Sequence, residues 1–331
     1  MIDLTRRTLL AGAAATTALA ATVTRAQPDA VAAAPDLSGK SILITGCSSG
    51  FGRVGAEHYA RLGAKVFATM RNLPRPEAEE LEALAHDENL DITVIELDVL
   101  DDDMVARAVA EAERLAGGAL DVLVNNAGIG ISGPVEVHDM EAVRLAFDTN
   151  VFGYHRLARA VLPAMRARKR GQIFAVSSQL GRVIVPFGGM YSANKFAVEA
   201  MFEQLAYELV PHNIDVTIIE PGGYPTKVWV NRNVYTGALK ERAAEIHTAG
   251  YPEVVAAMGT EDGSGRSADT MDVPRAIAEI AAMPPGTRPL RRAVSGSAIP
   301  QTEINRVAAQ TQLAMLGRSE RLGPLVRAVH D

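Results

Sequence analysis

The sequence has 331 residues, of which 48% are hydrophobic and 22% charged, as in an ordinary globular protein with a sizeable core. The formal net charge of −6 argues against a nucleic-acid-binding protein, because such proteins carry an excess of basic residues. The single cysteine, Cys47, excludes an internal disulfide, and no His or Cys pair has zinc-ligand spacing, so we expect no metal.

The first 26 residues have the features of an export signal. Arg6-Arg7 precede an apolar Ala/Thr/Leu run that ends at Val23, and Arg25-Ala26 close the segment. A basic start, a short apolar run and a small residue before a polar break are typical of a cleaved signal, and the paired arginines resemble the twin-arginine type. We therefore expect residues 1–26 to be a signal peptide, 27–36 a linker and 37–331 the folded domain.

Cleavage after Ala26 would place the mature protein in the periplasm, with the export machinery as a transient partner. The alternative is an uncleaved membrane anchor, although an apolar run of about fifteen residues is short for a span. If the signal is not used, the protein stays in the cytoplasm.

The folded domain opens with a strand and a glycine-rich turn. Ser41–Ile44 is a short apolar run typical of a buried parallel strand, and a helix is expected over 54–62. Glycines between them let the backbone approach a diphosphate, which the amides at the helix N-terminus would then face. Such a turn can also be a simple tight connection. The candidate phosphate-binding residues are Gly46, Ser48, Ser49, Gly50, Phe51 and Gly52.

The next strand, 65–69, ends near Arg71, where an NAD-binding enzyme usually has an acidic residue for the ribose 2′-hydroxyl. The planar guanidinium of Arg71 can instead pair with a 2′-phosphate, which favours NADP(H) over NAD(H). The alternative is an arginine that only contacts solvent. A third strand, 92–97, ends at Asp98-Val99, and Asp101-Asp102-Asp103 cap the helix that follows.

Polar residues follow each of the next two strands. The strand 120–124 leads into Asn125-Asn126-Ala127-Gly128, which suits a ligand across the sheet edge, and the strand 172–176 leads into Ser177-Ser178. Between them, a long helix over 140–165 contains Asn150, a residue that helices usually tolerate at some cost.

Tyr191 and Lys195 are four residues apart at the start of a predicted helix, so they share one face. A nearby ammonium group favours the phenolate and would lower the pKa of the tyrosine toward neutrality, which suits proton transfer. The spacing alone also fits two unrelated surface residues.

A sixth strand, 214–219, precedes Pro221-Gly222, and strands alternate with helices throughout. This alternation predicts an α/β fold with a doubly wound parallel sheet of the Rossmann type. The segment at about 224–268 has no clear strand and is expected to cover the site as a substrate lid within the same domain. A helix over 273–283, a strand over 291–294 and a closing helix over 301–316 complete the domain.

Together these motifs resemble the short-chain dehydrogenase/reductase family over residues 39–300, and segments such as Gly133-Pro134-Val135-Glu136 look most like its 17β-hydroxysteroid and retinol dehydrogenase branch. The resemblance implies Tyr191 as general acid and base, Lys195 as the residue that lowers its pKa and holds the nicotinamide ribose, Ser178 as a hydrogen-bond donor to the substrate oxygen, and Asn150 as the holder of a relay water. It also implies cofactor contacts from Asp98, Val99, Asn125, Ala127, Gly128, Tyr191, Lys195, Pro221, Gly222 and Thr226.

The expected function is hydride transfer between NADP(H) and a secondary alcohol, ketone or aldehyde. Two alternatives stay open: a redox sensor that binds NADP(H) without turnover, and an epimerase or isomerase with tightly held NAD. A second apolar stripe on the Tyr191 helix (Val198, Phe202, Leu209) predicts a homodimer or homotetramer.

Overall fold

The computed structural model describes residues 34–331, so the predicted signal peptide and most of the predicted linker lie outside the described residues. Within residues 34–331, no helix combines the length and hydropathy that crossing a membrane requires.

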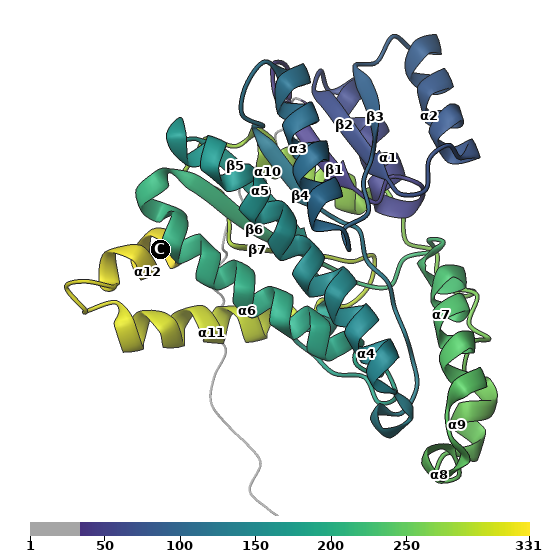
Figure 1. The fold of residues 1–331 in the computed structure, drawn as a ribbon. Coiled ribbons are helices and arrows are strands. Elements are labelled where there is room, and N and C mark those ends of the chain that lie inside the picture. The colour runs from purple at the N-terminus through teal and green to yellow at the C-terminus, as the bar shows by residue number, and fades with distance from the viewer. Residues whose placement is uncertain (1–33) are drawn as a thin grey trace, which may run out of the picture. The chain divides into compact units, whose positions relative to one another are not determined.

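Seven parallel strands form one sheet in the order β3-β2-β1-β4-β5-β6-β7 (Figure 1). Their apolar runs pair in register, for example Ile42 of β1 with Val66 of β2 and with Val122 of β4. The chain order reverses between β1 and β4, which confirms the predicted doubly wound, Rossmann-type sheet. The strands are β1 Ser41–Thr45, β2 Lys65–Met70, β3 Ile92–Glu96, β4 Val122–Asn125, β5 Gly171–Val176, β6 Ile214–Pro221 and β7 Arg291–Val294.

Helices cover both faces of the sheet, and each face has its own hydrophobic core. Ile42 and Ile44 of β1 point into the core under α1, α2 and α10, whereas Leu43 points into the core under α3, α5 and α6. This alternation follows from the two-residue period of a strand. The helices are α1 Gly50–Arg61, α2 Pro76–Asp87, α3 Asp102–Ala116, α4 Met140–Phe147, α5 Gly153–Ala167, α6 Tyr191–Leu209, α7 Val228–Arg242, α8 Glu245–Thr248, α9 Pro252–Ala257, α10 Asp272–Ala282, α11 Gln301–Leu316 and α12 Gly323–His330.

The predicted acidic cap of α3 is confirmed. The Asp101 side chain accepts a hydrogen bond of 2.8 Å from the backbone N–H of Met104, and Asp102 and Asp103 lie in the first turn. Asp101 thus satisfies an otherwise unpaired backbone N–H group, and the negative charges interact favourably with the positive end of the helix dipole.

The long helix expected over 140–165 is interrupted. A turn of π-helix, Asp148–Phe152, separates α4 from α5 and contains Asn150. A π turn inserts an extra residue into the helix and is frequent at functional sites. Sequence periodicity could not distinguish it from a continuous helix, because the apolar residues on both sides keep helical spacing.

The segment at about 224–268 is helical and docks on the loop after β4. Its helices α7, α8 and α9 lie to one side of the layered domain in Figure 1. The hydroxyl of Thr236 accepts a hydrogen bond of 3.1 Å from the Ser132 N–H, and Leu239 and Met258 pack with Ile131 in a third apolar cluster. We call residues 228–268, which contain α7 to α9 and the loop that follows them, the lid.

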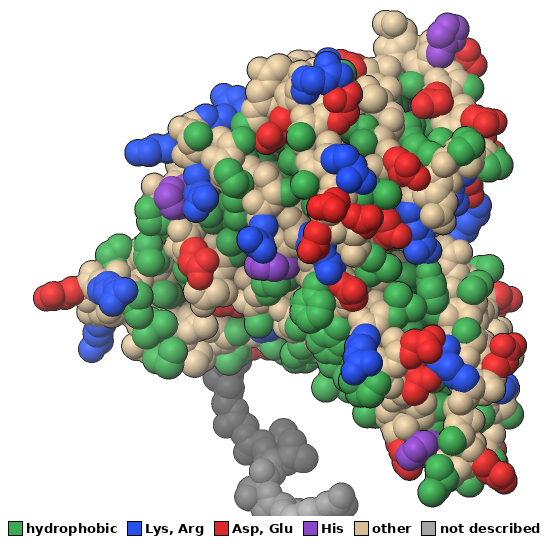
Figure 2. Space-filling model, in the orientation of Figure 1, with side chains coloured by type: hydrophobic (Ala, Val, Ile, Leu, Met, Phe, Trp, Pro, Cys, Tyr) green, Lys and Arg blue, Asp and Glu red, His purple; other side chains and the backbone are tan. Residues whose placement is uncertain are grey.

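The apolar stripe on α6 does not support the predicted assembly. Val198 and Phe202 are fully buried and Leu209 is 3% exposed, because all three pack in the core under α3, α5 and α6. Figure 2 shows hydrophobic side chains gathered over α4 and the start of α5 beside the lid, a region where Met140 and Phe152 are 58% and 51% exposed. The homodimer or homotetramer stays a prediction.

Candidate active site

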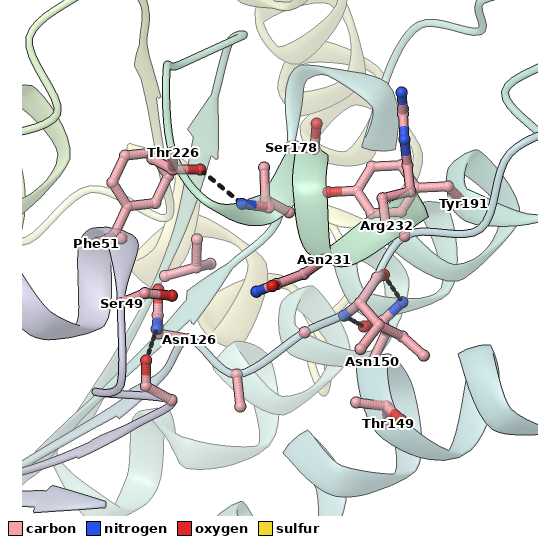
Figure 3. Close-up of a pocket in the computed structure, with 18 of the residues that line it drawn as sticks. Ser49, Phe51, Asn126, Thr149, Asn150, Ser178, Tyr191, Thr226, Asn231 and Arg232 are labelled. Carbon is pink, nitrogen blue, oxygen red and sulfur yellow. Dashed lines mark hydrogen bonds between the residues drawn. The ribbon is translucent and has the colours of Figure 1, made fainter. Parts of the chain in front are cut away.

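A cavity of about 550 Å³ lies at the carboxyl ends of the strands and extends under α7 (Figure 3). Its size lies within the usual range for small-molecule sites. Every predicted site residue lines it except Gly52 and Asn125. The predicted residues that line it are Gly46, Ser48, Ser49, Gly50, Phe51, Arg71, Asp98, Val99, Ala127, Gly128, Asn150, Ser178, Tyr191, Lys195, Pro221, Gly222 and Thr226.

The glycine-rich turn has the shape that a diphosphate requires. Gly46 has φ +76°, and a Cβ there would lie 2.9 Å from the Cα of Ala127. A Cβ on Gly52 would lie 2.3 Å from the carbonyl oxygen of Gly46, so Gly52 allows α1 to pack on the turn without lining the cavity. The turn is followed at once by α1, whose first-turn amides can bind an anion. The turn therefore fits the phosphates of a dinucleotide.

The loop after β4 is held to this turn by Thr45. Its hydroxyl accepts hydrogen bonds of 2.9 Å from the N–H groups of Asn126 and Ala127, and Asn126 Nδ2 donates to the Thr45 carbonyl at 2.8 Å. Asn126 lines the cavity, whereas Asn125 is fully buried with Nδ2 directed to the Phe174 carbonyl at 3.4 Å. The structure thus places Asn126, rather than the predicted Asn125, in the lining of the cavity.

Asn150 fixes the next part of the same loop. Its side-chain oxygen accepts from the Ile129 N–H at 2.8 Å, and its Nδ2 donates to the Ile129 carbonyl at 2.9 Å. The side chain is fully buried. An asparagine inside a helix is usually unfavourable. Here the π turn directs the Asn150 side chain toward the backbone of Ile129, where both its oxygen and its Nδ2 form hydrogen bonds.

Ser178, Tyr191 and Lys195 converge on the cavity from two elements. Ser178 follows β5, and Tyr191 and Lys195 occupy the first turn of α6. The Lys195 Nζ donates to the Val176 carbonyl at 2.8 Å and lies 5.7 Å from the centroid of the Tyr191 ring. Burial lowers the pKa of Lys195 to about 8, while Glu199 raises it.

The pKa of Tyr191 differs from the sequence-based expectation. Burial raises it above its ordinary value, and the nearby Ser178 hydroxyl and Arg232 guanidinium only partly oppose this effect. The ring is surrounded by protein, although part of its surface opens on the cavity. The expectation that the pKa of Tyr191 is lowered toward neutrality is therefore wrong in this structure, because desolvation of the phenolate dominates.

Two arginines lie at the end of the cavity beyond β2. The exposed Arg71 donates from Nη2 to the Tyr235 hydroxyl of α7 at 2.8 Å, and Arg75 Nη1 donates to the Arg71 carbonyl at 3.2 Å. Asp98 is the one carboxylate that lines the cavity within residues 34–331. Burial lowers the pKa of Arg71, but the hydrogen bond to Tyr235 and, to a smaller extent, the charge of Asp98 raise it above its ordinary value. Arg75 was not predicted, because an arginine five residues after the strand end has no local signature.

The lid supplies several further lining residues that the sequence did not identify. Trp229, Asn231 and Arg232 on α7 line the cavity together with Val234 and Tyr235. Figure 3 shows Asn231 and Arg232 on the same side of the cavity as Tyr191. The lack of a clear strand in this segment predicted a lid, but only the docking of α7 shows which side chains reach the cavity.

Comparisons with known proteins identify the family. The family model for short chain dehydrogenases matches residues 40–235, more than half of the chain, and the protein belongs to that family. Retinol dehydrogenase 8 of Bos taurus is 41% identical over 219 residues, 64% of this chain and 65% of that protein. The 17-beta-hydroxysteroid dehydrogenase type 1 of Mus musculus is 38% identical over 209 residues, 61% of this chain and 59% of that protein.

The chain thus matches less than two thirds of the length of either relative. A crystal structure of a short-chain dehydrogenase from Streptomyces avermitilis has a TM-score of 0.63 at 31% identity, and the match covers 85% of this chain and 98% of that one. These similarities confirm the predicted family, its Rossmann-type fold and the likeness to the retinol and hydroxysteroid dehydrogenases. The protein is thus a member of the short-chain dehydrogenase/reductase family.

Proposed function

We propose that this protein reduces a ketone or aldehyde with NADPH, or oxidises the corresponding alcohol with NADP⁺. The observation that carries the proposal is the convergence of Ser178, Tyr191 and Lys195 on one side of a cavity whose other side has a phosphate-binding turn. A redox sensor has no need of a buried phenol beside an ammonium group, so this arrangement favours turnover over binding alone.

The turn Gly46–Gly52, Thr226 and Lys195 would hold the dinucleotide, which supplies or accepts a hydride when it is bound. Lys195 uses one of its three N–H donors on the Val176 carbonyl, so the others are free for ribose hydroxyls. A Cβ on Gly50 would lie 3.5 Å from Thr226 Cβ, so the start of α1 and the segment before α7 enclose the same part of the cavity.

Tyr191 would donate its proton to the substrate oxygen during reduction. The raised pKa keeps the phenol protonated at neutral pH, which suits an acid. Ser178 would stabilise the negative charge that develops on the same oxygen by donating a hydrogen bond. Its hydroxyl oxygen already accepts from the Leu180 N–H at 3.1 Å, which leaves the O–H donor available.

The Tyr191→Phe variant tests this function. It keeps the ring and loses the proton donor, so we expect unchanged NADPH binding and turnover reduced by a factor of at least about 10². NADPH oxidation would be followed across a panel of ketones and aldehydes, with fluorescence titration for cofactor binding. Retention of more than about a tenth of wild-type turnover would show that Tyr191 is not the acid.

The preference for NADP(H) rests on Arg71 and Arg75. No acid stands at the end of β2 to bind a ribose 2′-hydroxyl, and both guanidinium groups line that end of the cavity. A charge-assisted hydrogen bond contributes enough to change affinity by about tenfold or more. Arg71→Gln should therefore weaken NADPH at least about tenfold and leave NADH nearly unchanged.

Arg114→Gln is the control for this experiment, since Arg114 is an exposed residue of α3 that pairs only with Glu111. Equal affinity of the wild-type protein for NADPH and NADH would contradict the proposed preference.

A further inference from the structure

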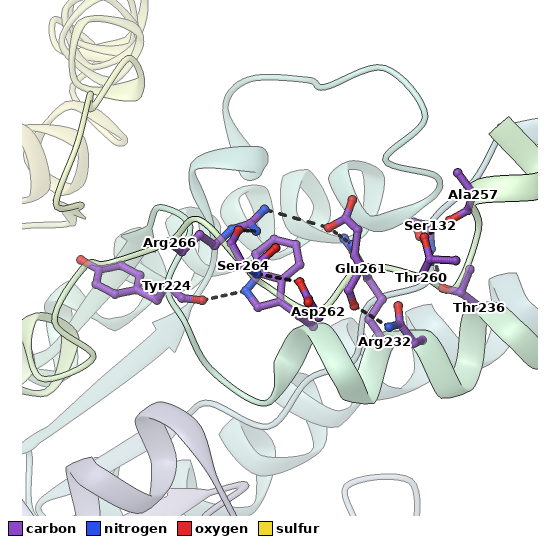
Figure 4. Close-up of polar contacts among 12 residues, drawn as sticks. Ser132, Tyr224, Arg232, Thr236, Ala257, Thr260, Glu261, Asp262, Ser264 and Arg266 are labelled. Atoms are coloured by element: carbon purple, nitrogen blue, oxygen red, sulfur yellow. Dashed lines mark hydrogen bonds and ion pairs between the residues drawn. The ribbon is translucent and has the colours of Figure 1, made fainter. Parts of the chain in front are cut away.

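The lid carries a stacked cluster of charged and aromatic side chains above the cavity, consisting of Arg232, Trp229, Arg266 and Glu261 (Figure 4). The Cζ atoms of Arg266 and Arg232 lie 3.6 Å and 4.6 Å from the centroid of the Trp229 ring. Glu261 pairs with Arg232 and lies 4.0 Å from Arg266. Cation–π contacts and an ion pair therefore restrain Arg232 to one orientation. We call these four residues the lid cluster.

The indole of the lid cluster is fixed to the main body of the domain. Its Nε1 donates to the Tyr224 carbonyl at 2.7 Å, just after β6. A Cβ on Gly263 would lie 2.6 Å from the indole Cδ1, so this glycine permits the loop 258–268 to close over the ring. The cluster thus has a rigid support, which a residue that orients a substrate requires.

Arg232 is the member of the cluster that faces the catalytic residues. It lines the cavity, and its positive charge lowers the pKa of Tyr191 (Figure 3). Its alkyl chain passes beside Gly130, where a Cβ would lie 2.9 Å from Arg232 Cδ. The side chain is 18% exposed, and its Nε–H is buried without an acceptor among residues 34–331. The buried Nε is out of reach of a ligand, but Nη1 donates to no acceptor among residues 34–331 while Nη2 is held by Glu261, so the two N–H groups of Nη1 can bind a ligand oxygen.

The charges around Arg232 leave a net attraction for an anion. The lid cluster contains two guanidinium groups and one carboxylate, a net charge of 2 − 1 = +1. Glu261 lies on the solvent side, since its side chain is 55% exposed. The adjacent Asp262 is also negatively charged and interacts with Arg266, but it does not line the cavity. Four cationic side chains but only one carboxylate, Asp98, line the cavity within the described part of the chain. Those cations are Arg71, Arg75, Lys195 and Arg232.

We propose that Arg232 binds the carboxylate of an oxo-acid substrate, an inference that rests on the function proposed above. The enzyme is then an oxo-acid reductase or, in the reverse direction, a hydroxy-acid dehydrogenase. The carbonyl carbon gains a hydride from the reduced nicotinamide, and its oxygen gains the proton of Tyr191, so the product is the hydroxy acid. The carboxylate takes no part in the bond changes. Its role is to place the carbonyl oxygen at Ser178 and Tyr191.

The phosphates of the cofactor do not account for Arg232. The turn that fits the phosphates, Gly46–Gly52, lies beside Thr226. Arg232 lies six residues beyond Thr226 along the chain and is close enough to Tyr191 to lower its pKa. Arg71 and Arg75 already line the end of the cavity where a 2′-phosphate would bind.

The proposal is tested with 3-oxo, 4-oxo and 5-oxo aliphatic acids and the primary amide of each, which has nearly the same shape without the charge. The wild-type protein should prefer at least one acid over its amide by at least about tenfold in kcat/KM. Arg232→Gln should lower kcat/KM for that acid about 10²-fold, mainly through KM, and for the amide less than about threefold. Arg232→Lys should keep part of the preference, because it keeps the charge without the planar fork.

The control is Arg306→Gln on α11, an exposed arginine outside the cavity, which should leave both substrates unaffected. Binding of NADPH is measured for every variant by fluorescence titration. An equal loss of kcat/KM for acid and amide in Arg232→Gln would mean that Arg232 affects only the pKa of Tyr191. A tenfold weaker affinity for NADPH with an unchanged acid-to-amide ratio of kcat/KM would mean that Arg232 binds the cofactor. Either result overturns the proposal.

Failure of the wild-type protein to prefer any acid, while it reduces neutral ketones, would also overturn the carboxylate proposal and leave the proposed function intact. Failure to oxidise NADPH with any ketone or aldehyde would instead overturn the proposed function.

Discussion

Arg291 pairs with a buried group of carboxylates next to α6, the helix that carries Tyr191 and Lys195. Replacing it should lower the stability of the fold. Its Nε lies 2.8 Å from Glu199 and 3.6 Å from Glu220, and its Nη2 lies 2.6 Å from Glu203. The side chains of Arg291, Glu199 and Glu220 are 7%, 2% and 0% exposed. Asn305 of α11 donates to both oxygens of Glu220, so the cluster joins α6, β6, β7 and α11.

Arg291→Gln should lower the free energy of unfolding by about 3–5 kcal/mol at pH 8, the usual cost when one partner of a buried ion pair is removed. Burial and the neighbouring Glu199 already raise the pKa of Glu220 from 4.5 to about 8. A carboxyl group with a raised pKa binds more protons in the folded state, so its contribution to stability falls as the pH rises from about 4.5 to about 8. Loss of Arg291 raises the pKa further, and the destabilisation should therefore be smaller at pH 6 than at pH 8.

The assay is urea denaturation at pH 6 and pH 8, and equal m values would justify the comparison. Arg292→Gln is the matched control, because this neighbour is 48% exposed and pairs with the exposed Glu279 at 3.2 Å. It should change the free energy of unfolding by less than about 1 kcal/mol. A loss below about 1 kcal/mol for Arg291→Gln at pH 8, or the same loss at both pH values, would refute the reasoning about the buried cluster.

Two further predictions concern the catalytic lysine and the N-terminus. Because burial lowers the pKa of Lys195 from 10.5 to about 8, the charged form destabilises the fold below about pH 8, so Lys195→Met should raise the free energy of unfolding at pH 7 by about 1–3 kcal/mol while turnover is lost. Urea denaturation and an activity assay check this, and a variant less stable than the wild type would contradict it. Replacing Arg6 and Arg7 by lysine should leave the full-length precursor in the cytoplasm, whereas the native protein should begin near Gln27 in the periplasm. Cell fractionation with N-terminal sequencing tests this prediction, and normal export and cleavage of the double-lysine form would rule out the twin-arginine route.

The fold, and most of the predicted residues that line the cavity, could be read from the sequence. Seven short apolar runs, each followed by a turn and a helical segment, were enough to predict the sheet, because strand period, turn chemistry and helix spacing are local properties. The places of Ser178 after a strand and of Tyr191 and Lys195 on one helix face are also local properties, but that spacing alone fitted unrelated surface residues too. The likeness to a known family added their roles.

Only the tertiary structure decided which other side chains reach the cavity and what their surroundings do to them. Arg232 lies 41 residues beyond Tyr191 in the sequence. Its charge lowers the pKa of Tyr191 only because α7 docks over the loop after β4. The raised pKa of Tyr191 likewise depends on how much protein surrounds the phenol, which no spacing reveals. The fully buried Val198 shows the same limit, because an apolar stripe cannot indicate whether the core or a second subunit covers it. Burial and charge–charge distances are set by contacts between segments far apart in the chain, and the order of the residues alone does not contain them.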